Sequence, residues 1–133
     1  MAIIDFVLPE NAEGNVNDIY SQFTNMNIPI PLPLQMYSAS PGLLMAQNQF
    51  LNYFMNHKKL SFSLLAHIRM LIANAESFSY CLNLNQQLLK TMGGLDEDQI
   101  NATLEDPNNA VLDEKEKAML LFVLKAVQDP AVA

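Results

Sequence analysis

The chain has a single cysteine, Cys81, and no tryptophan among its 133 residues. One sulfur cannot form an internal disulfide, which excludes a small secreted domain held together by disulfides and is typical of the reducing cytoplasm. A dithiol that cycles to a disulfide within one subunit is excluded for the same reason, since the attacking thiolate must be resolved by a second thiol. We therefore expect a cytoplasmic protein.

Positive charge is also scarce. The sequence contains seven Lys and Arg residues and 14 Asp and Glu residues, which gives a formal net charge of −7. A nucleic-acid-binding protein needs clustered basic residues to meet phosphates, and anionic lipid attracts basic segments in the same way. No long apolar run occurs: the interrupted run 64–75 contains His67, Arg69 and Asn74. We expect neither a nucleic-acid partner nor a membrane partner.

Recognisable cofactor and metal motifs are missing as well. The two histidines, His57 and His67, the one cysteine and the scattered acids show no metal-ligand spacing. No glycine-rich phosphate loop and no G-x-S-x-G motif is present. The acidic run 96–98 is better explained as the start of a helix. The sequence predicts no cofactor and no metal.

What the chain does have is a core-forming composition with helical spacing. Half of its residues are hydrophobic and 16% are charged, which predicts one folded domain over residues 1–133. Residues 1–40 are interpreted as an N-terminal arm, with a short helix over 15–25 capped by Asn15 and an extended proline-rich connector over 28–35. Residues 41–128 are interpreted as a helical core. The prediction is an all-α, single-domain helical bundle of about six helices.

Several residues indicate where helices begin and end. Ser40 precedes a proline and Ser61 opens a run that is apolar almost all round, which predicts a central, buried helix there. Asp96 and Gln99 have capping-box spacing, and Asp113 precedes the last helix. Gly93-Gly94 predicts a left-handed end to the helix that contains Cys81.

The Cys81 region reads Ser-Phe-Ser-Tyr-Cys-Leu-Asn-Leu-Asn over 77–85 and leads to Gly93-Gly94. Together with segments 9–14, 38–44, 60–61, 94–100 and 112–122, it resembles the alkylhydroperoxidase D-like and carboxymuconolactone decarboxylase family, in its peroxidase-related branch. The resemblance implies that family's all-helical fold and a homo-oligomer, a dimer or a trimer of dimers.

Redox members of that family carry Cys-x-x-Cys, a His four residues after the second Cys, and an upstream Glu that feeds a proton relay. At the matching positions, this chain has Phe78 for the first Cys, Cys81 for the second, Asn85 for the His and Ala66 for the Glu. Phe and Ala do not titrate, and an amide is neither acid nor base near neutral pH. The resemblance therefore implies the family scaffold with a degenerate redox site.

Cys81 has two readings. It shares a helical face with Leu84, Leu88 and Met92, which favours a small buried hydrophobe in the core. Alternatively it is a reactive single thiol, activated by its place at the start of a helix.

Glu76 and His67 are the accompanying candidates. Glu76 either suits the helix start electrostatically or replaces the missing relay Glu, and His67 is either a hydrogen-bonded structural residue or a base. The candidate catalytic set is therefore Cys81, Glu76 and His67, and the pocket candidates are Tyr80, Asn85 and Phe78.

Two functional hypotheses follow. In the first, the protein is an oligomer that has lost dithiol peroxidase chemistry. It either binds a small apolar or acidic molecule in a pocket beside Cys81, Tyr80, Asn85 and His67, or serves only as an assembly. In the second, it is an antioxidant or decarboxylase-like enzyme that uses a rearranged site. The last two long helices carry more apolar residues than a small bundle requires, which favours self-association, although packing inside the monomer's own core is the alternative.

Overall fold

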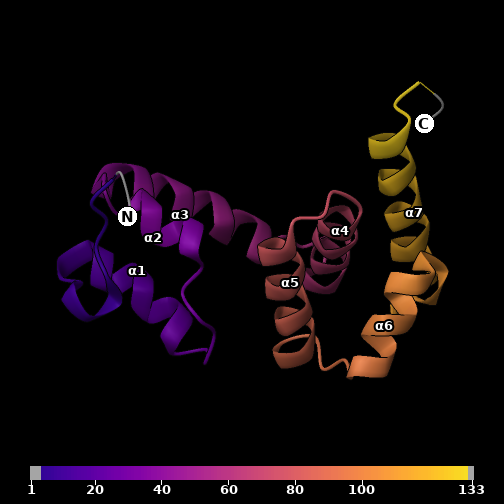
Figure 1. Cartoon of the computed structure of the whole chain (residues 1–133), viewed down its shortest axis with the longest axis horizontal. Coiled ribbons are helices and arrows are strands. Elements are labelled where there is room, and N and C mark those ends of the chain that lie inside the picture. The colour runs from indigo at the N-terminus through magenta and orange to yellow at the C-terminus, as the bar shows by residue number, and fades with distance from the viewer. Residues whose placement is uncertain (1–3, 132–133) are drawn as a thin grey trace. The chain divides into compact units, whose positions relative to one another are not determined.

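The computed structural model describes residues 4–131, and the regular elements in that range are all helices, with no strand, which confirms the all-α prediction. The ends of the predicted 1–133 domain, residues 1–3 and 132–133, lie outside the described residues. In chain order the elements are η1 (Pro9–Asn11), α1 (Gly14–Thr24), α2 (Leu32–Tyr37), α3 (Pro41–Met55), α4 (Phe62–Ala75), α5 (Ser79–Thr91), α6 (Glu97–Glu105), η2 (Pro107–Asn109) and α7 (Glu114–Gln128) (Figure 1).

The contacts group into two compact units, Met1–His57 and Lys58–Ala133. In the first unit α3 packs against α1 and α2. The boundary between the two units follows His57, and helix α3 lies in the first unit. Helix α3 belongs with the N-terminal helices because its buried side includes Leu44, which is fully inaccessible.

The first unit is held by the predicted apolar face of α1 and by two polar ties. The α1 face buries Val16, Ile19, Tyr20 and Phe23. The Tyr20 hydroxyl donates to the Val7 carbonyl oxygen at 2.8 Å, and the Val7 amide donates to the Ser38 hydroxyl oxygen at 2.7 Å. Tyr20 and Ser38 are both buried, so these bonds fix the extended N-terminal segment against α1 and α2.

Helix α2 corrects the prediction of an extended connector over 28–35. Pro31 is its N-cap and Pro33 lies in its first turn. Amides of the first turn have no partner inside a helix, so the missing N–H of proline costs nothing there. The Leu34 amide donates to the Pro31 carbonyl oxygen at 2.9 Å, and the Leu34 side chain is buried. The prolines thus start a short helix and do not prevent one.

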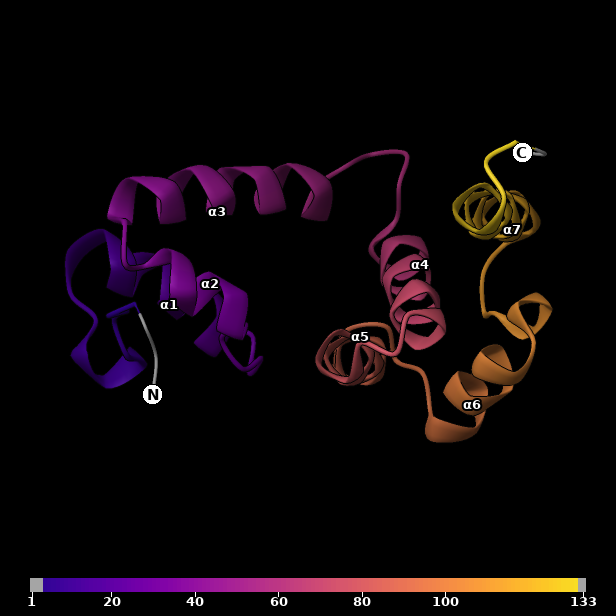
Figure 2. The same ribbon diagram turned by 45° about the horizontal axis from the view of Figure 1, so that its top comes forward.

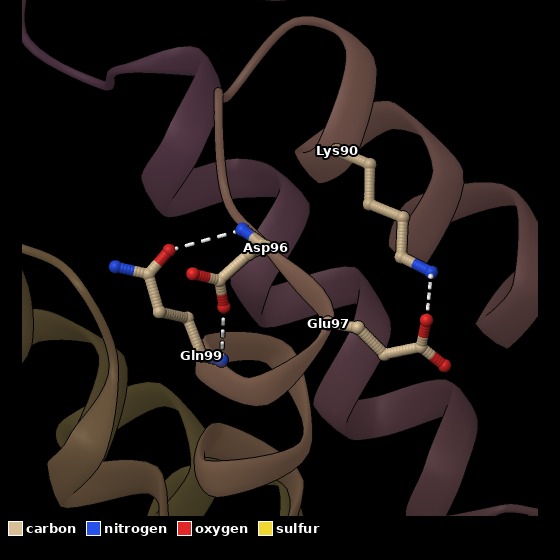
Figure 3. Close-up of polar contacts among 4 residues, drawn as sticks. All are labelled: Lys90, Asp96, Glu97 and Gln99. Carbon is tan, nitrogen blue, oxygen red and sulfur yellow. Dashed lines mark hydrogen bonds and ion pairs between the residues drawn. The ribbon is translucent and has the colours of Figure 1, made fainter.

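Three predicted helix starts in the second unit are confirmed by their capping bonds. The Ser61 hydroxyl accepts from the Leu64 amide at 3.0 Å, and the Asp113 carboxylate accepts from the Glu116 amide at 2.8 Å. A complete capping box opens α6, as Figure 3 shows: the Asp96 carboxylate accepts from the Gln99 amide at 2.8 Å, and the Gln99 side chain accepts from the Asp96 amide at 3.0 Å.

Two other capping predictions differ from the structure. Ser40 occupies the N-cap of α3, as expected, but its side chain makes no capping bond. Asn15 lies inside α1, whose N-cap is Glu13. Proline at the first position of α3 supplies the helical φ without help from the hydroxyl.

Helix α4 is the centre of the second unit, as its apolar sequence predicts, and it packs against α5 and α7 (Figure 2). Its residues Leu64, Met70 and Leu71 form a core with Leu89 of α5 and Leu120 of α7. The predicted left-handed end of α5 is also confirmed: Gly94 adopts φ +69°, and the amide after it donates to the Leu89 carbonyl oxygen at 3.1 Å.

The α5–α6 connection carries one exposed ion pair. The Lys90 ammonium lies 3.4 Å from the Glu97 carboxylate, also shown in Figure 3. Both side chains face solvent, so this pair contributes at most about 1 kcal/mol. The burial of Ile100 and Thr103, not this ion pair, holds α6 against the rest of the unit.

Candidate functional site

A tight turn after α4 determines where Cys81 lies. The Phe78 amide donates to the Ala73 carbonyl oxygen at 2.8 Å and the Ser77 amide to the Asn74 carbonyl oxygen at 3.3 Å, which is a Schellman arrangement. Ser77 takes the left-handed position, with φ +58°, that glycine usually occupies. Helix α5 then starts at Ser79, so Cys81 lies in its first turn.

Cys81 is exposed, and the prediction that it packs in the core is therefore wrong. The core-facing stripe of α5 runs through Leu82, Asn85 and Leu89, one residue further along than the stripe that begins at Cys81. Because the buried side includes the polar residue Asn85, the positions of the apolar residues alone do not indicate which side of α5 faces the core. Cys81 is accessible to reagents and to ligands.

Asn85 occupies that buried side with only 4% of its surface exposed. Its side-chain amide nitrogen donates to the Cys81 carbonyl oxygen at 2.8 Å, and its amide oxygen accepts from the Arg69 guanidinium at 3.1 Å. Asn85 therefore joins α5 to α4. Both the oxygen and the nitrogen of the side-chain amide are therefore hydrogen-bonded, as buried polar groups generally are.

His67, in the middle of α4, is completely buried. Its Nδ1 lies 2.7 Å from the Ser63 carbonyl oxygen, so Nδ1 carries the proton and donates there. Nε2 is then a bare acceptor, and it is buried with no hydrogen-bond partner in the described part of the chain. Burial lowers the pKa of His67, opposed in part by the Ser63 bond and by the negative charge of Glu116 on α7.

The candidate catalytic residues differ in their surroundings: His67 is buried, whereas Cys81 and Glu76 are exposed. No hydrogen bond or ion pair within residues 4–131 joins any two of Cys81, Glu76 and His67. Phe78 and Tyr80 are exposed at 61% and 42%, close in sequence to Cys81 at the start of α5. A catalytic role for the three residues stays a prediction.

A groove lies elsewhere in the second unit, and our reading of the sequence missed it. It has a volume of about 190 Å³ and is lined by Leu71, Ile72, Asn74, Ala75, Glu76, Leu104, Pro107, Leu124, Val127 and Gln128. Of the candidate residues only Glu76 lines it. The lining comes from the ends of three helices that are far apart in sequence, so no local motif could have revealed it.

Within 4–131, no three or more His, Cys, Asp or Glu side chains gather where they could hold a metal ion. None of the helices described there combines the length and apolar character needed to cross a bilayer.

Comparison of the chain with family models, curated proteins and solved structures found no match.

Proposed function

We propose that this protein is a cytoplasmic, alkylhydroperoxidase D-like helical protein without dithiol peroxidase chemistry, which binds a small molecule as a homo-oligomer. The observation that carries the proposal is the environment of Cys81. One turn before it lies an exposed phenyl ring, and one turn after it lies Asn85, whose amide is already committed to Arg69 and to the Cys81 carbonyl. Neither neighbour can resolve an oxidised sulfur or relay a proton.

The test is hydroperoxide consumption in the presence of dithiothreitol, with wild type compared to Cys81→Ser. Because Cys81 is exposed and serine is close to it in size, the variant should fold normally. We expect the two proteins to consume peroxide at the same background rate. Turnover by the wild type that disappears in Cys81→Ser contradicts the proposal.

The exposure of Cys81 is the observation that favours the enzymatic alternative, an antioxidant or decarboxylase-like activity at a rearranged site. Alkylation of the native protein with iodoacetamide at pH 7 distinguishes the two. We expect Cys81 to react without denaturant, because it is exposed, and at the rate of a small free thiol. A much faster reaction, together with a sulfenate after peroxide treatment, favours the enzyme.

Self-association is supported by α7. Among its residues only Leu120 is buried, whereas Met119, Phe122 and Val127 are at least 38% exposed. A helix that is apolar on most sides is normally covered, and a second copy of the chain would cover it. We expect a dimer or a trimer of dimers in sedimentation equilibrium, and a smaller species for Phe122→Glu. Sedimentation of the wild type as a monomer at all concentrations contradicts this part of the proposal.

A further inference from the structure

We propose that the groove bordered by the ends of α4, α6 and α7 binds a small organic cation, an ammonium group carried on a short apolar chain. The inference names a class of ligand for the small-molecule binding proposed above, and it rests on that proposed function. It places the ligand at Glu76 and away from Cys81, so it can be tested without reference to the thiol.

The shape of the groove sets the size of the ligand. Its wall is mainly apolar, formed by Leu71, Ile72, Ala75, Leu104, Pro107, Leu124 and Val127. Its volume of about 190 Å³ is below the range of roughly 300–1,000 Å³ typical of sites for drug-sized molecules. A short alkyl chain fits such a wall, and its burial supplies part of the affinity.

The charge of the groove sets the sign of the ligand. Each of the three helices contributes residues of its last turn: α4 ends at Ala75, α6 at Glu105 and α7 at Gln128. A helix C-terminus carries about half a negative charge on its unsatisfied carbonyl groups. Three such ends border one groove, together with the Glu76 carboxylate. None of the lining residues is Lys, Arg or His.

The backbone at the end of α7 leaves acceptors available, whereas at the end of α4 the Ala73 and Asn74 carbonyl oxygens are already taken by the Schellman turn. In α7, the last capping bond runs from the Asp129 amide to the Lys125 carbonyl oxygen, and no described residue donates to the three carbonyls after it. Lys125 is the one basic residue in the last turn of α7, but its side chain is exposed and does not line the groove. A cation in the groove therefore meets carbonyl oxygens and one carboxylate, whereas an anion meets repulsion.

The experiment is a titration of the uniformly ¹⁵N-labelled full chain, followed by amide chemical shifts, with hexylammonium, hexan-1-ol and hexanoate at one ionic strength. The three probes share an apolar chain and differ in charge. We expect saturable shifts at groove amides such as Ile72, Leu104 and Val127 for hexylammonium, weaker ones for the alcohol and none for hexanoate.

Two variants separate charge from shape. Glu76→Gln keeps the size of an exposed side chain, and we expect hexylammonium to bind about two- to fivefold more weakly, as for an exposed ion pair. Hexan-1-ol should bind Glu76→Gln as it binds the wild type. The matched control is Glu114→Gln, which removes the same charge at the opposite end of α7 and should leave both affinities unchanged.

The proposal is overturned by equal affinity for the three probes, by equal effects of Glu76→Gln and Glu114→Gln, or by shifts confined to residues outside the groove. None of these results depends on peroxide turnover. A failed cation site is therefore distinguishable from a failed assignment of the thiol.

Discussion

The buried imidazole of His67 makes the stability of the second unit sensitive to acid. Its side chain is fully inaccessible, Nδ1–H is bonded to Ser63, and Nε2 has no partner in the described residues. A proton added at Nε2 would place a charge and an unsatisfied N–H inside the core. The unfolded chain has no such restriction and takes up the proton near the ordinary pKa of 6.5.

The direction of the effect follows from linkage. The folded pKa of His67 is lowered, so below about pH 6.5 the unfolded state binds more protons than the folded state. The stability that His67 contributes is complete above that pH and is lost as the pH falls toward the folded pKa. The slope is about 1.4 kcal/mol per pH unit, so the loss between pH 7 and pH 5 is at most about 2 kcal/mol. Glu116, whose charge opposes the shift, reduces this figure.

The assay is urea unfolding of the wild type and of His67→Gln at half-unit steps from pH 7 to pH 5. Glutamine remains neutral, so the free energy of unfolding of the variant should fall less steeply over this range, whatever its absolute stability. The control is His57→Gln, at the only other histidine, which should keep the wild-type slope. Parallel pH profiles for wild type and His67→Gln would refute the reasoning.

Three further predictions concern the fold, and all are measured by the free energy of unfolding at pH 7. Leu120→Ala should lower the free energy of unfolding by about 2–5 kcal/mol because this side chain of α7 is fully buried. Val111→Ala, at a position that is 46% exposed, should change it by less than about 0.5 kcal/mol, and equal losses of stability in the two variants would contradict the assigned core. Gly93→Ala should destabilise the protein because the new methyl group would lie 2.6 Å from the Leu89 carbonyl oxygen of α5. Gly42→Ala, in the first turn of α3, places its methyl group where no atom lies within 4 Å and should be neutral or stabilising. Unchanged stability of Gly93→Ala would show that the turn after α5 can shift. Asp96→Ala removes the acceptor of the α6 capping box and should cost about 1 kcal/mol, and an unchanged midpoint would mean that the cap contributes nothing.

Helix starts were the most predictable features of this chain. Ser61, Asp96 with Gln99, and Asp113 each form the expected capping bond, because a cap is a local interaction between a side chain and an amide within four residues. Helix α2 is not predicted by the sequence because the alternating prolines of 28–35 remove amide donors and fix φ, which argues against the interior of a helix but not against its first turn. The position of each proline relative to the first turn decides whether a helix can form.

The candidate site was less predictable, because it depends on how each helix is rotated about its axis. The stripe of apolar neighbours favours a core position for Cys81 over a reactive one, but the buried side of α5 runs through Asn85, which Arg69 of α4 satisfies. A buried amide with its partner on another helix has no signature in the local sequence. Ser77, which takes the left-handed position of the α4–α5 turn without being glycine, also gave no signal.

Composition and local pattern determined the helical class, most helix boundaries and the presence of a single thiol, because these follow from residue types and interactions within a few positions. Tertiary packing decided that Cys81 faces outward, that His67 is enclosed with a bare Nε2, and that the ends of α4, α6 and α7 border one groove. Those properties arise from contacts between helices that are distant in the chain. Core packing selects the rotation and pairing of those helices, and the order of residues within any one helix does not specify them.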